Sequence, residues 1–239
     1  MRFLAIDSAT EFCSVALSVG EGESLQLFSR GDELPRKHSQ ALLPFVNEVL
    51  SEAGVNLAQL DAIIVSQGPG SFTGVRIGAS IAQGLAFSQN LPMVQVSTLA
   101  AMAQACYRQH QAEQVAAAID ARMGEVYFGT YQAVDGLMQQ VGKEMVCPPQ
   151  GVILPQMDAG PGQWMGCGTG WETYADELSE ALHSQLAELQ LADTVRFPHA
   201  VDMLTLGIAA FKQGAGIDAV DLSPNYLRNE VTWQKLPGR

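Results

Sequence analysis

Apolar residues alternate with polar ones at the start of the chain, in a pattern that predicts three β-strands. The runs cover residues 2–6, 12–20 and 24–28, and their short connections indicate an antiparallel meander. The polar segment RGDELPRK that follows is expected to be a loop. Over residues 38–53 the apolar side chains change to helical spacing, with Pro44 either in the first turns or at a kink.

A glycine-rich segment, SQGPGSFTGVRIG, separates the next predicted strand (61–66) from a helix near 72–88. The segment PMVQV then predicts a short strand, and Ser97 is a good N-cap for a helix that ends before His110. Gly68, Gly70 and Gly74 form G-x-G-x-x-x-G, which is one residue longer than the dinucleotide fingerprint, and no P-loop lysine follows. We interpret these three glycines and Gly78 as a tight strand-to-helix turn with close helix packing; phosphate binding is the alternative.

The chain contains an internal echo. LAIDSATEFCSVALS near the start resembles AAIDARMGEVYFGTY near the middle, and each has an apolar strand ending in AID, a short turn and a second β-rich run. A third strand over 137–146 would complete the parallel with the first half. A chance match is the alternative, but duplicated halves predict two related lobes. We assign residues 1–110 to an N-terminal lobe and 111–239 to a C-terminal lobe, with a helix at about 200–214 that packs back on the first.

Composition narrows the possible partners. The net charge is −12, from 13 basic and 25 acidic residues, so the chain alone is expected to bind nucleic acid poorly. A protein or small-molecule partner fits this charge better than a nucleic acid does. The four cysteines of the chain lie far apart without a CxxC pair, which argues against a disulfide framework or a cysteine zinc site. Neither a signal peptide nor a membrane-spanning run is expected, so we predict the cytoplasm as the compartment.

Six blocks resemble the TsaB family, also called YeaZ, nearly from end to end. They are AIDSATEFCSVAL, HSQALLPFV, QGPGSFTGVRIGASIAQGLA, VSTLAAMAQ, AIDARMGEVYFGTY and SPNYLRNEVTWQKLP. The resemblance implies an α/β, two-lobed fold of the actin, sugar kinase and heat-shock ATPase class, with a mixed sheet flanked by helices in each lobe. It also implies a scaffold for tRNA threonylcarbamoyladenosine modification. Such a scaffold would pair with the transferase TsaD, work with the ATPase TsaE and meet tRNA only through their complex.

The residues agree with a scaffold that has no catalytic residues. Residues 62–112 contain not one Asp or Glu, so this stretch offers no carboxylate to hold magnesium or activate a nucleophile. TsaD-like enzymes carry a metal-binding HxxxH pair, but the matching segment here, VSTLAAMAQ, has none. No metal and no cofactor are expected in the isolated chain, and the resemblance leaves ATP to the complex with TsaE. The alternative is an ATP-dependent small-molecule kinase or a carbamoyl-type transferase of the same fold.

Two turns and one further glycine-rich segment are candidates for nucleotide binding. Asp7 and Asp120 end the first strands of the two lobes, where the kinases of this superfamily approach a metal–nucleotide complex. The candidate residues are Asp7, Ser8, Asp120, Gly168 and Gly170, the glycines lying in MGCGTGWETY. The alternative is that each aspartate accepts hydrogen bonds from backbone donors of its own turn.

Helices 38–53 and 72–88 are the predicted partner surface, homodimeric when the chain is alone and heterodimeric with TsaD. Gly74, Gly78, Ala82 and Ala86 repeat every four residues, and such a stripe serves either a partner's close approach or internal packing. The interface residues are His38, Leu42, Phe45, Val46, Phe72, Thr73, Arg76, Ile77, Ser80 and Ala82. Arg76 is expected either to reach an acid on TsaD or to form a salt bridge within this chain.

Overall fold

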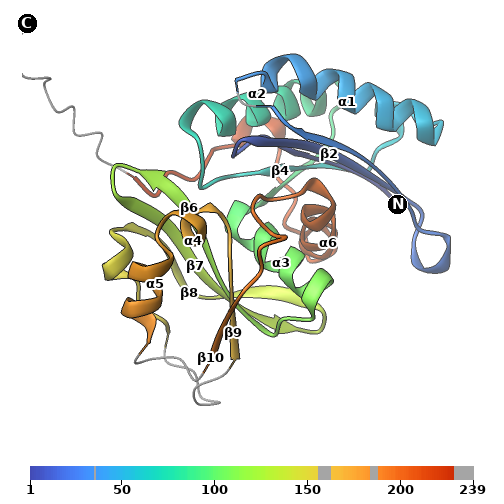
Figure 1. The fold of residues 1–239 in the computed structure, drawn as a ribbon. Coiled ribbons are helices and arrows are strands. Elements are labelled where there is room, and N and C mark those ends of the chain that lie inside the picture. The colour runs from blue at the N-terminus through green and yellow to red at the C-terminus, as the bar shows by residue number, and fades with distance from the viewer. Residues whose placement is uncertain (35, 156–162, 184–187, 229–239) are drawn as a thin grey trace, which may run out of the picture.

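Two five-stranded mixed sheets form the framework of the molecule (Figure 1). The computed structural model describes residues 1–34, 36–155, 163–183 and 188–228. The first sheet has the order β3-β2-β1-β4-β5, and the second has the order β10-β9-β6-β7-β8. The strands are β1 (Arg2–Asp7), β2 (Phe12–Val19), β3 (Gln26–Glu33), β4 (Ala62–Ser66), β5 (Met93–Val96), β6 (Gln114–Arg122), β7 (Glu125–Val134), β8 (Leu137–Cys147), β9 (Gln163–Cys167) and β10 (Glu188–Leu191).

The two sheets repeat one topology. In each, three antiparallel strands in chain order are followed by two strands that run parallel to the first. Asp7 and Asp120 occupy matching places, because Asp7 pairs with Ser14 and Asp120 pairs with Val126 on the antiparallel neighbour. The internal echo in the sequence therefore corresponds to a structural duplication, and the predicted fold class of two lobes with mixed sheets is confirmed.

Strand β3 corrects one prediction. The segment RGDE was expected to begin a loop, but it continues the strand to Glu33, which pairs with Phe12. The strand lies at the edge of the sheet and most of its side chains face solvent, so it needs no apolar alternation. Gly31 allows this pairing, because a Cβ there would lie 2.8 Å from the Phe12 ring.

Helices α1 (His38–Ala53) and α2 (Phe72–Gln89) cover the outer face of the first sheet (Figure 1). Pro44 lies inside α1, which ends at a left-handed Gly54. Ser71 caps α2 by accepting a hydrogen bond from the Gly74 N–H. Apolar side chains of both helices pack on the strands in one core cluster, including Leu42, Val46, Val49, Ala82, Ala86, Leu4, Ile6, Val15, Ile63 and Val65.

Helices α3 (Thr98–His110) and α6 (Ala200–Lys212) lie between the two sheets and contact each other (Figure 1). Although α3 follows the first sheet in the chain, Leu99 and Met102 on α3 pack on β6 of the second. Helix α6 in turn packs Met203 and Leu204 on the first sheet. Each half of the chain therefore contributes a helix that packs on the sheet of the other half. The division of the chain at residue 110 stays a prediction.

The remaining short elements complete the second half and return the chain to the first. Helices α4 (Thr169–Thr173) and α5 (Ala175–Leu182) pack on the far face of the second sheet, and 3-10 turns occur at Gly22–Ser24, Leu57–Gln59, Pro149–Gly151 and Ala219–Asp221. The C-terminal segment then runs back to the first lobe, where the Asn225 N–H donates to the Gln67 carbonyl at 2.8 Å. In the part of the chain that the structure describes, no helix is long and apolar enough to cross a membrane.

Candidate functional site: the α1–α2 face and the junction of the lobes

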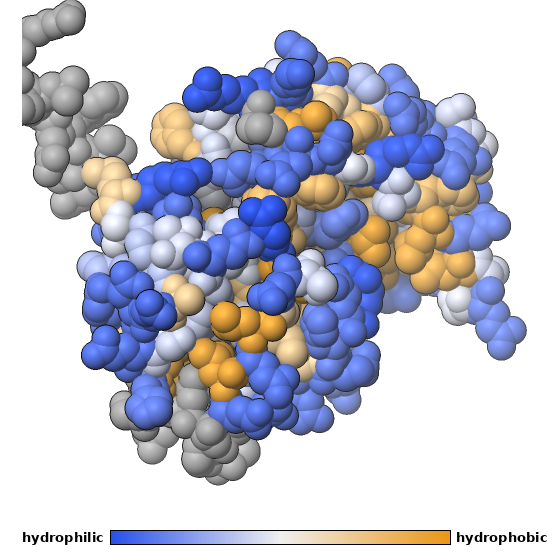
Figure 2. Space-filling model, viewed as in Figure 1, coloured by the Kyte–Doolittle hydropathy of each residue, from blue (hydrophilic) through white to orange (hydrophobic). Residues whose placement is uncertain are grey.

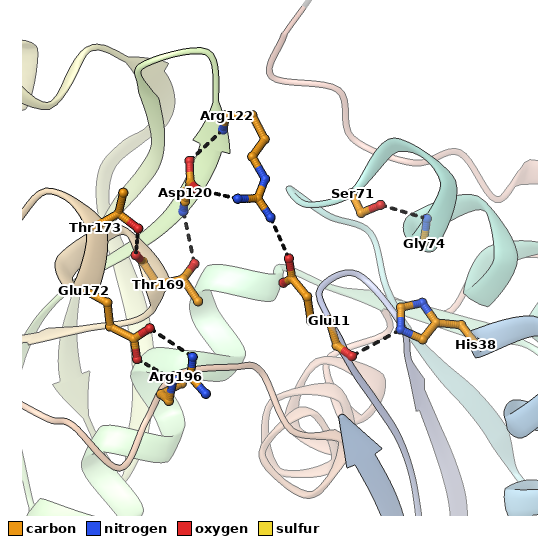
Figure 3. A network of polar contacts seen from close by, with 10 residues as sticks. All are labelled: Glu11, His38, Ser71, Gly74, Asp120, Arg122, Thr169, Glu172, Thr173 and Arg196. Atoms are coloured by element: carbon orange, nitrogen blue, oxygen red, sulfur yellow. Dashed lines mark hydrogen bonds and ion pairs between the residues drawn. The ribbon is translucent and has the colours of Figure 1, made fainter. Parts of the chain in front are cut away.

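The turns that end β1 and β6 lie opposite each other where the two lobes meet, and Arg122 joins them (Figure 3). Its guanidinium donates to Glu11 Oε1 at 2.8 Å in the first lobe and to Asp120 Oδ2 at 2.9 Å in the second. The Asp120 backbone N–H donates to Thr169 Oγ1 at 3.1 Å. Asp120 is thus held by its own lobe and by an arginine, and its carboxylate is already paired.

Two further arginines hold carboxylates near this junction. Arg196 pairs with Glu172 (Figure 3) and lies 3.7 Å from Glu33 Oε2, so it also joins the two lobes. Arg228, on the C-terminal segment, pairs with Glu125. These ion pairs were not predicted from the sequence, although Arg122 stands two residues after the repeated AID motif.

Asp7 and Ser8 lie beneath helix α2. Asp7 is fully buried; its Oδ1 accepts the Ala9 N–H at 3.2 Å, and its Oδ2 has no hydrogen-bond partner among the described residues. Burial raises the pKa of Asp7 from 3.8 to about 6, and the nearby Ser66 hydroxyl and backbone amides offset part of this rise. The Ser66 Oγ lies close enough to affect the Asp7 carboxyl, but it forms no hydrogen bond of normal geometry with any described residue. Ser8 donates to the Gly74 carbonyl at 2.9 Å, so its hydroxyl anchors the helix.

The other glycine candidates bring α4 close to the second sheet. Gly168 has φ of +101°, and a Cβ there would lie 2.2 Å from the Ala118 carbonyl oxygen. A Cβ at Gly170 would meet Ala118 at 2.7 Å. Gly168 also lines a hollow of about 50 Å³ between β9, α4 and β10, beside the Arg196–Glu172 pair. Ligand pockets of drug-sized molecules span ~300–1,000 Å³, so this hollow has no room for a nucleotide.

Titratable side chains form no obvious metal centre. Within the described residues, no group of three or more His, Cys, Asp or Glu side chains is placed to hold a metal ion. The four cysteines are free thiols, and burial together with the charge of Asp7 raises the pKa of Cys13 to about 12. A thiol with that pKa stays protonated at neutral pH and is a poor ligand or nucleophile.

The glycine loop packs the start of α2 onto the β1–β2 turn. A Cβ at Gly70 would lie 2.3 Å from the Ala9 carbonyl oxygen, and one at Gly74 would lie 2.2 Å from the Ser8 carbonyl oxygen. A Cβ at Gly78 would reach the Ser8 hydroxyl at 2.7 Å, and Gly68 has φ of +94°. Each of these positions therefore favours glycine because of close packing or backbone conformation.

Four residues of the predicted partner surface face the core, which corrects the prediction. Leu42 and Ala82 are fully buried, Val46 is 2% exposed and His38 is 7% exposed. The Gly/Ala stripe of α2 points inward because its small residues let the helix approach the β1–β2 turn and the sheet. Of the two uses for such a stripe, the structure shows internal packing.

The other six predicted residues reach the surface of α1 and α2. They are Phe45, Phe72, Thr73, Arg76, Ile77 and Ser80, all exposed or half-buried, and the half-buried Phe45 and Ile77 also pack against the core cluster under these helices. On α2 the outward stripe is Thr73, Ile77, Ser80 and Gly84, and a Cβ at Gly84 would meet nothing within 4 Å. Over this region at the top of Figure 2, apolar residues are interspersed with polar ones. Leu43 and Phe87, exposed by 45% and 71%, also belong to these helices and were not predicted.

Arg76 lies at one end of this face, stacked between two aromatic rings. Its guanidinium carbon is 3.3 Å from the Phe72 ring centroid and 4.7 Å from that of Tyr226. One guanidinium nitrogen donates to the Phe72 carbonyl at 2.8 Å. Among the described residues Arg76 forms no ion pair, so the alternative of an internal salt bridge is not found there. Tyr226 was missed because it is distant in sequence.

Comparisons with known proteins point to one family. Residues 32–235 match the family model described as TsaD, tRNA N6-adenosine threonylcarbamoyltransferase. The chain is 44% identical to the Escherichia coli tRNA threonylcarbamoyladenosine biosynthesis protein TsaB over the full length of both, and 42% identical to the Haemophilus influenzae protein of that name over all of this chain and 98% of that one. The solved structure of YeaZ from Pseudomonas aeruginosa is 45% identical, with a TM-score of 0.84 over 95% of this chain and 99% of that one.

Proposed function

This chain belongs to the TsaB family of tRNA threonylcarbamoyladenosine biosynthesis proteins and carries a TsaD-type domain, and on that premise we propose that it is a non-catalytic partner subunit. In this proposal it binds TsaD through the outward face of α1 and α2 and helps to recruit the ATPase TsaE. When alone, it forms a homodimer through the same face. Work on tRNA implies the cytoplasm as its compartment.

The observation that carries the proposal is the character of the outward α2 face. Thr73, Ser80 and Gly84 are small, Ile77 is apolar, and the helix has no acidic residue. Small residues let the backbone of a facing helix approach closely, and burying this face would desolvate no carboxylate of α2. Leu43 and the half-buried Phe45 extend the apolar surface onto α1. Such a face suits association with other helices better than it suits chemistry.

The junction of the lobes supports a subunit without catalysis of its own. Asp120 and Glu11 are paired with Arg122, and Glu172 is paired with Arg196, so these carboxylates already have cationic partners. A general base or a magnesium ligand needs a carboxylate that is accessible to its substrate or ion. The acid-free stretch 62–112, which contains β4, α2, β5 and α3, supplies none.

The handling of ATP and tRNA is assigned to the complex. The hollow of about 50 Å³ beside Gly168 is far smaller than a nucleotide requires. A net charge of −12 opposes direct binding to the tRNA backbone. Nucleotide and tRNA would therefore bind where this subunit meets TsaD and TsaE, and no cofactor is assigned to the isolated chain.

The test is to mix the purified chain with the TsaD protein of the same organism and to measure complex mass by light scattering. A 1:1 complex is expected, and Ser80→Glu should weaken it by placing a charge in the outward stripe. Gln139→Glu is the control, because this side chain is exposed on β8 of the other sheet. The proposal fails if TsaD does not bind, or if both variants bind it as the wild type does. ATP turnover by the isolated chain would instead support the kinase or transferase alternative.

A further inference from the structure

The aromatic stack at the end of α2 holds a cation that no carboxylate among the described residues neutralises. Arg76 is the only charged residue of α2, in a protein with nearly twice as many acidic as basic residues. The arginines Arg30, Arg108, Arg122, Arg196 and Arg228 all pair with carboxylates. Arg76 instead lies against the rings of Phe72 and Tyr226, which are 64% and 42% exposed.

The rings fix where the guanidinium lies. Stacking on an aromatic face and the hydrogen bond to the Phe72 carbonyl restrict the side-chain rotamers of Arg76. Tyr226 is positioned from both halves of the molecule, because the Asn225 N–H binds the Gln67 carbonyl and Arg228 pairs with Glu125. A guanidinium has five N–H donors, and among the described residues the Phe72 carbonyl is the one acceptor that Arg76 binds. The free donors match a carboxylate, which an arginine binds through two parallel hydrogen bonds.

We propose that Arg76, held between Phe72 and Tyr226, is an anchor for a carboxylate on the TsaD partner, and that it favours this partner over a second copy of the chain. The inference rests on the proposed function, since it concerns the same face. In this proposal the end of the face near Arg76 binds a carboxylate, and the C-terminal segment contributes to that binding through Tyr226.

A second copy of this chain brings no matching acid on its α1–α2 face. Helix α2 has no Asp or Glu. On α1 the acidic residues are Glu48 and Glu52, and Arg30 of β3 already holds both, at 2.8 and 2.7 Å. Two α1–α2 faces that met would therefore bring two Arg76 side chains together with no free carboxylate on any of the four helices. Specificity of this kind arises from the difference between the two affinities.

The experiment measures both associations with one set of variants. Arg76→Gln keeps a long polar side chain but removes the charge, and the affinity for TsaD is expected to fall about tenfold or more, as for a truncated interfacial charge pair. The homodimer is expected to be unchanged or tighter in sedimentation velocity. Lys143→Gln is the matched control, because Lys143 is exposed on β8 and loses the same charge. Tyr226→Ala should lower TsaD affinity in the same direction, whereas Tyr226→Phe should keep it.

The outcomes separate the anchor from the proposed function. If Ser80→Glu abolishes the complex but Arg76→Gln leaves TsaD affinity unchanged, the anchor is overturned and the proposed function stands. If Arg76→Gln weakens the homodimer and the complex with TsaD equally, the proposed selectivity is overturned. Glu230→Gln tests whether the carboxylate belongs to this chain itself. If Glu230→Gln lowers TsaD affinity as much as Arg76→Gln does, and the double variant of Arg76→Gln and Glu230→Gln loses no more, Arg76 pairs with this chain's own C-terminal residues and the anchor is overturned. Failure of the wild type to bind TsaD would overturn both. Thermal melting checks that each variant is folded.

Discussion

Replacing Asp7 by Asn should make the protein more stable at neutral pH, although Asp7 belongs to one of the two repeated AID motifs. The carboxyl group is fully buried, and its Oδ2 has no hydrogen-bond partner among the described residues. Burial raises its pKa from 3.8 to about 6. The folded protein therefore holds the Asp7 proton over a pH range in which the unfolded chain has already released it.

The size of the effect follows from that difference. One pKa unit corresponds to about 1.4 kcal/mol, so ionised Asp7 lowers the free energy of unfolding by about 3 kcal/mol at pH values well above 6. In this pH range the native state binds more protons than the unfolded state. The free energy of unfolding is therefore highest at low pH and falls as pH rises from about 4 through about 6, while Asp7 ionises. Asn cannot ionise, and its amide can still accept the Ala9 N–H while offering a donor to the unpaired Ser66 hydroxyl.

Urea unfolding of the wild type and Asp7→Asn at several pH values measures this directly. The stability gained by the variant should grow by about 2 kcal/mol between pH 4.5 and pH 8, since wild-type Asp7 is already partly penalised at pH 4.5. Any constant effect of the new amide cancels in that difference. Asp32→Asn, at an exposed position on β3, controls for removal of one charge from an acidic protein. If the free energies of unfolding of the wild type and Asp7→Asn differ by the same amount at every pH, the claim that Asp7 is buried with a raised pKa is refuted.

Three substitutions on α2 test which of its faces is internal. Gly74→Ala should cost about 1–3 kcal/mol of stability, because its Cβ would lie 2.2 Å from the Ser8 carbonyl oxygen. Gly84→Ala, in the same helix with open space around it, should be neutral or stabilise by up to ~1 kcal/mol; equal melting temperatures would contradict the packing argument. Ala82→Glu should lose its circular dichroism signal for folded structure, because the carboxylate would be buried without a partner. A folded Ala82→Glu protein that has lost only its ability to associate would place that residue outside.

Local pattern was sufficient for most elements. The helical spacing over 38–53 predicts α1 with the bounds that the structure has, and the Ser97 cap places the start of α3. These signals depend on neighbours within one or two turns, so they can be detected without knowledge of the fold. The repeat of AID likewise indicated the duplication, because both halves form the same strand and turn at that motif. The second half of strand β3 was not predicted, because an edge strand whose side chains face solvent has no apolar pattern to detect.

The direction in which each surface faces was decided by the tertiary structure. Periodicity finds a small-residue stripe on α2, from Gly74 to Ala86, but a helix alone does not determine whether that stripe meets the sheet or a partner. The inward choice depends on the β1–β2 turn, where the Ser8 carbonyl oxygen leaves no room for a side chain. The sequence by itself determined the elements, the duplication and the lack of acids over 62–112. Only the folded chain brings Tyr226 to Arg76 and Arg122 to Glu11, because those contacts join residues that local pattern does not relate.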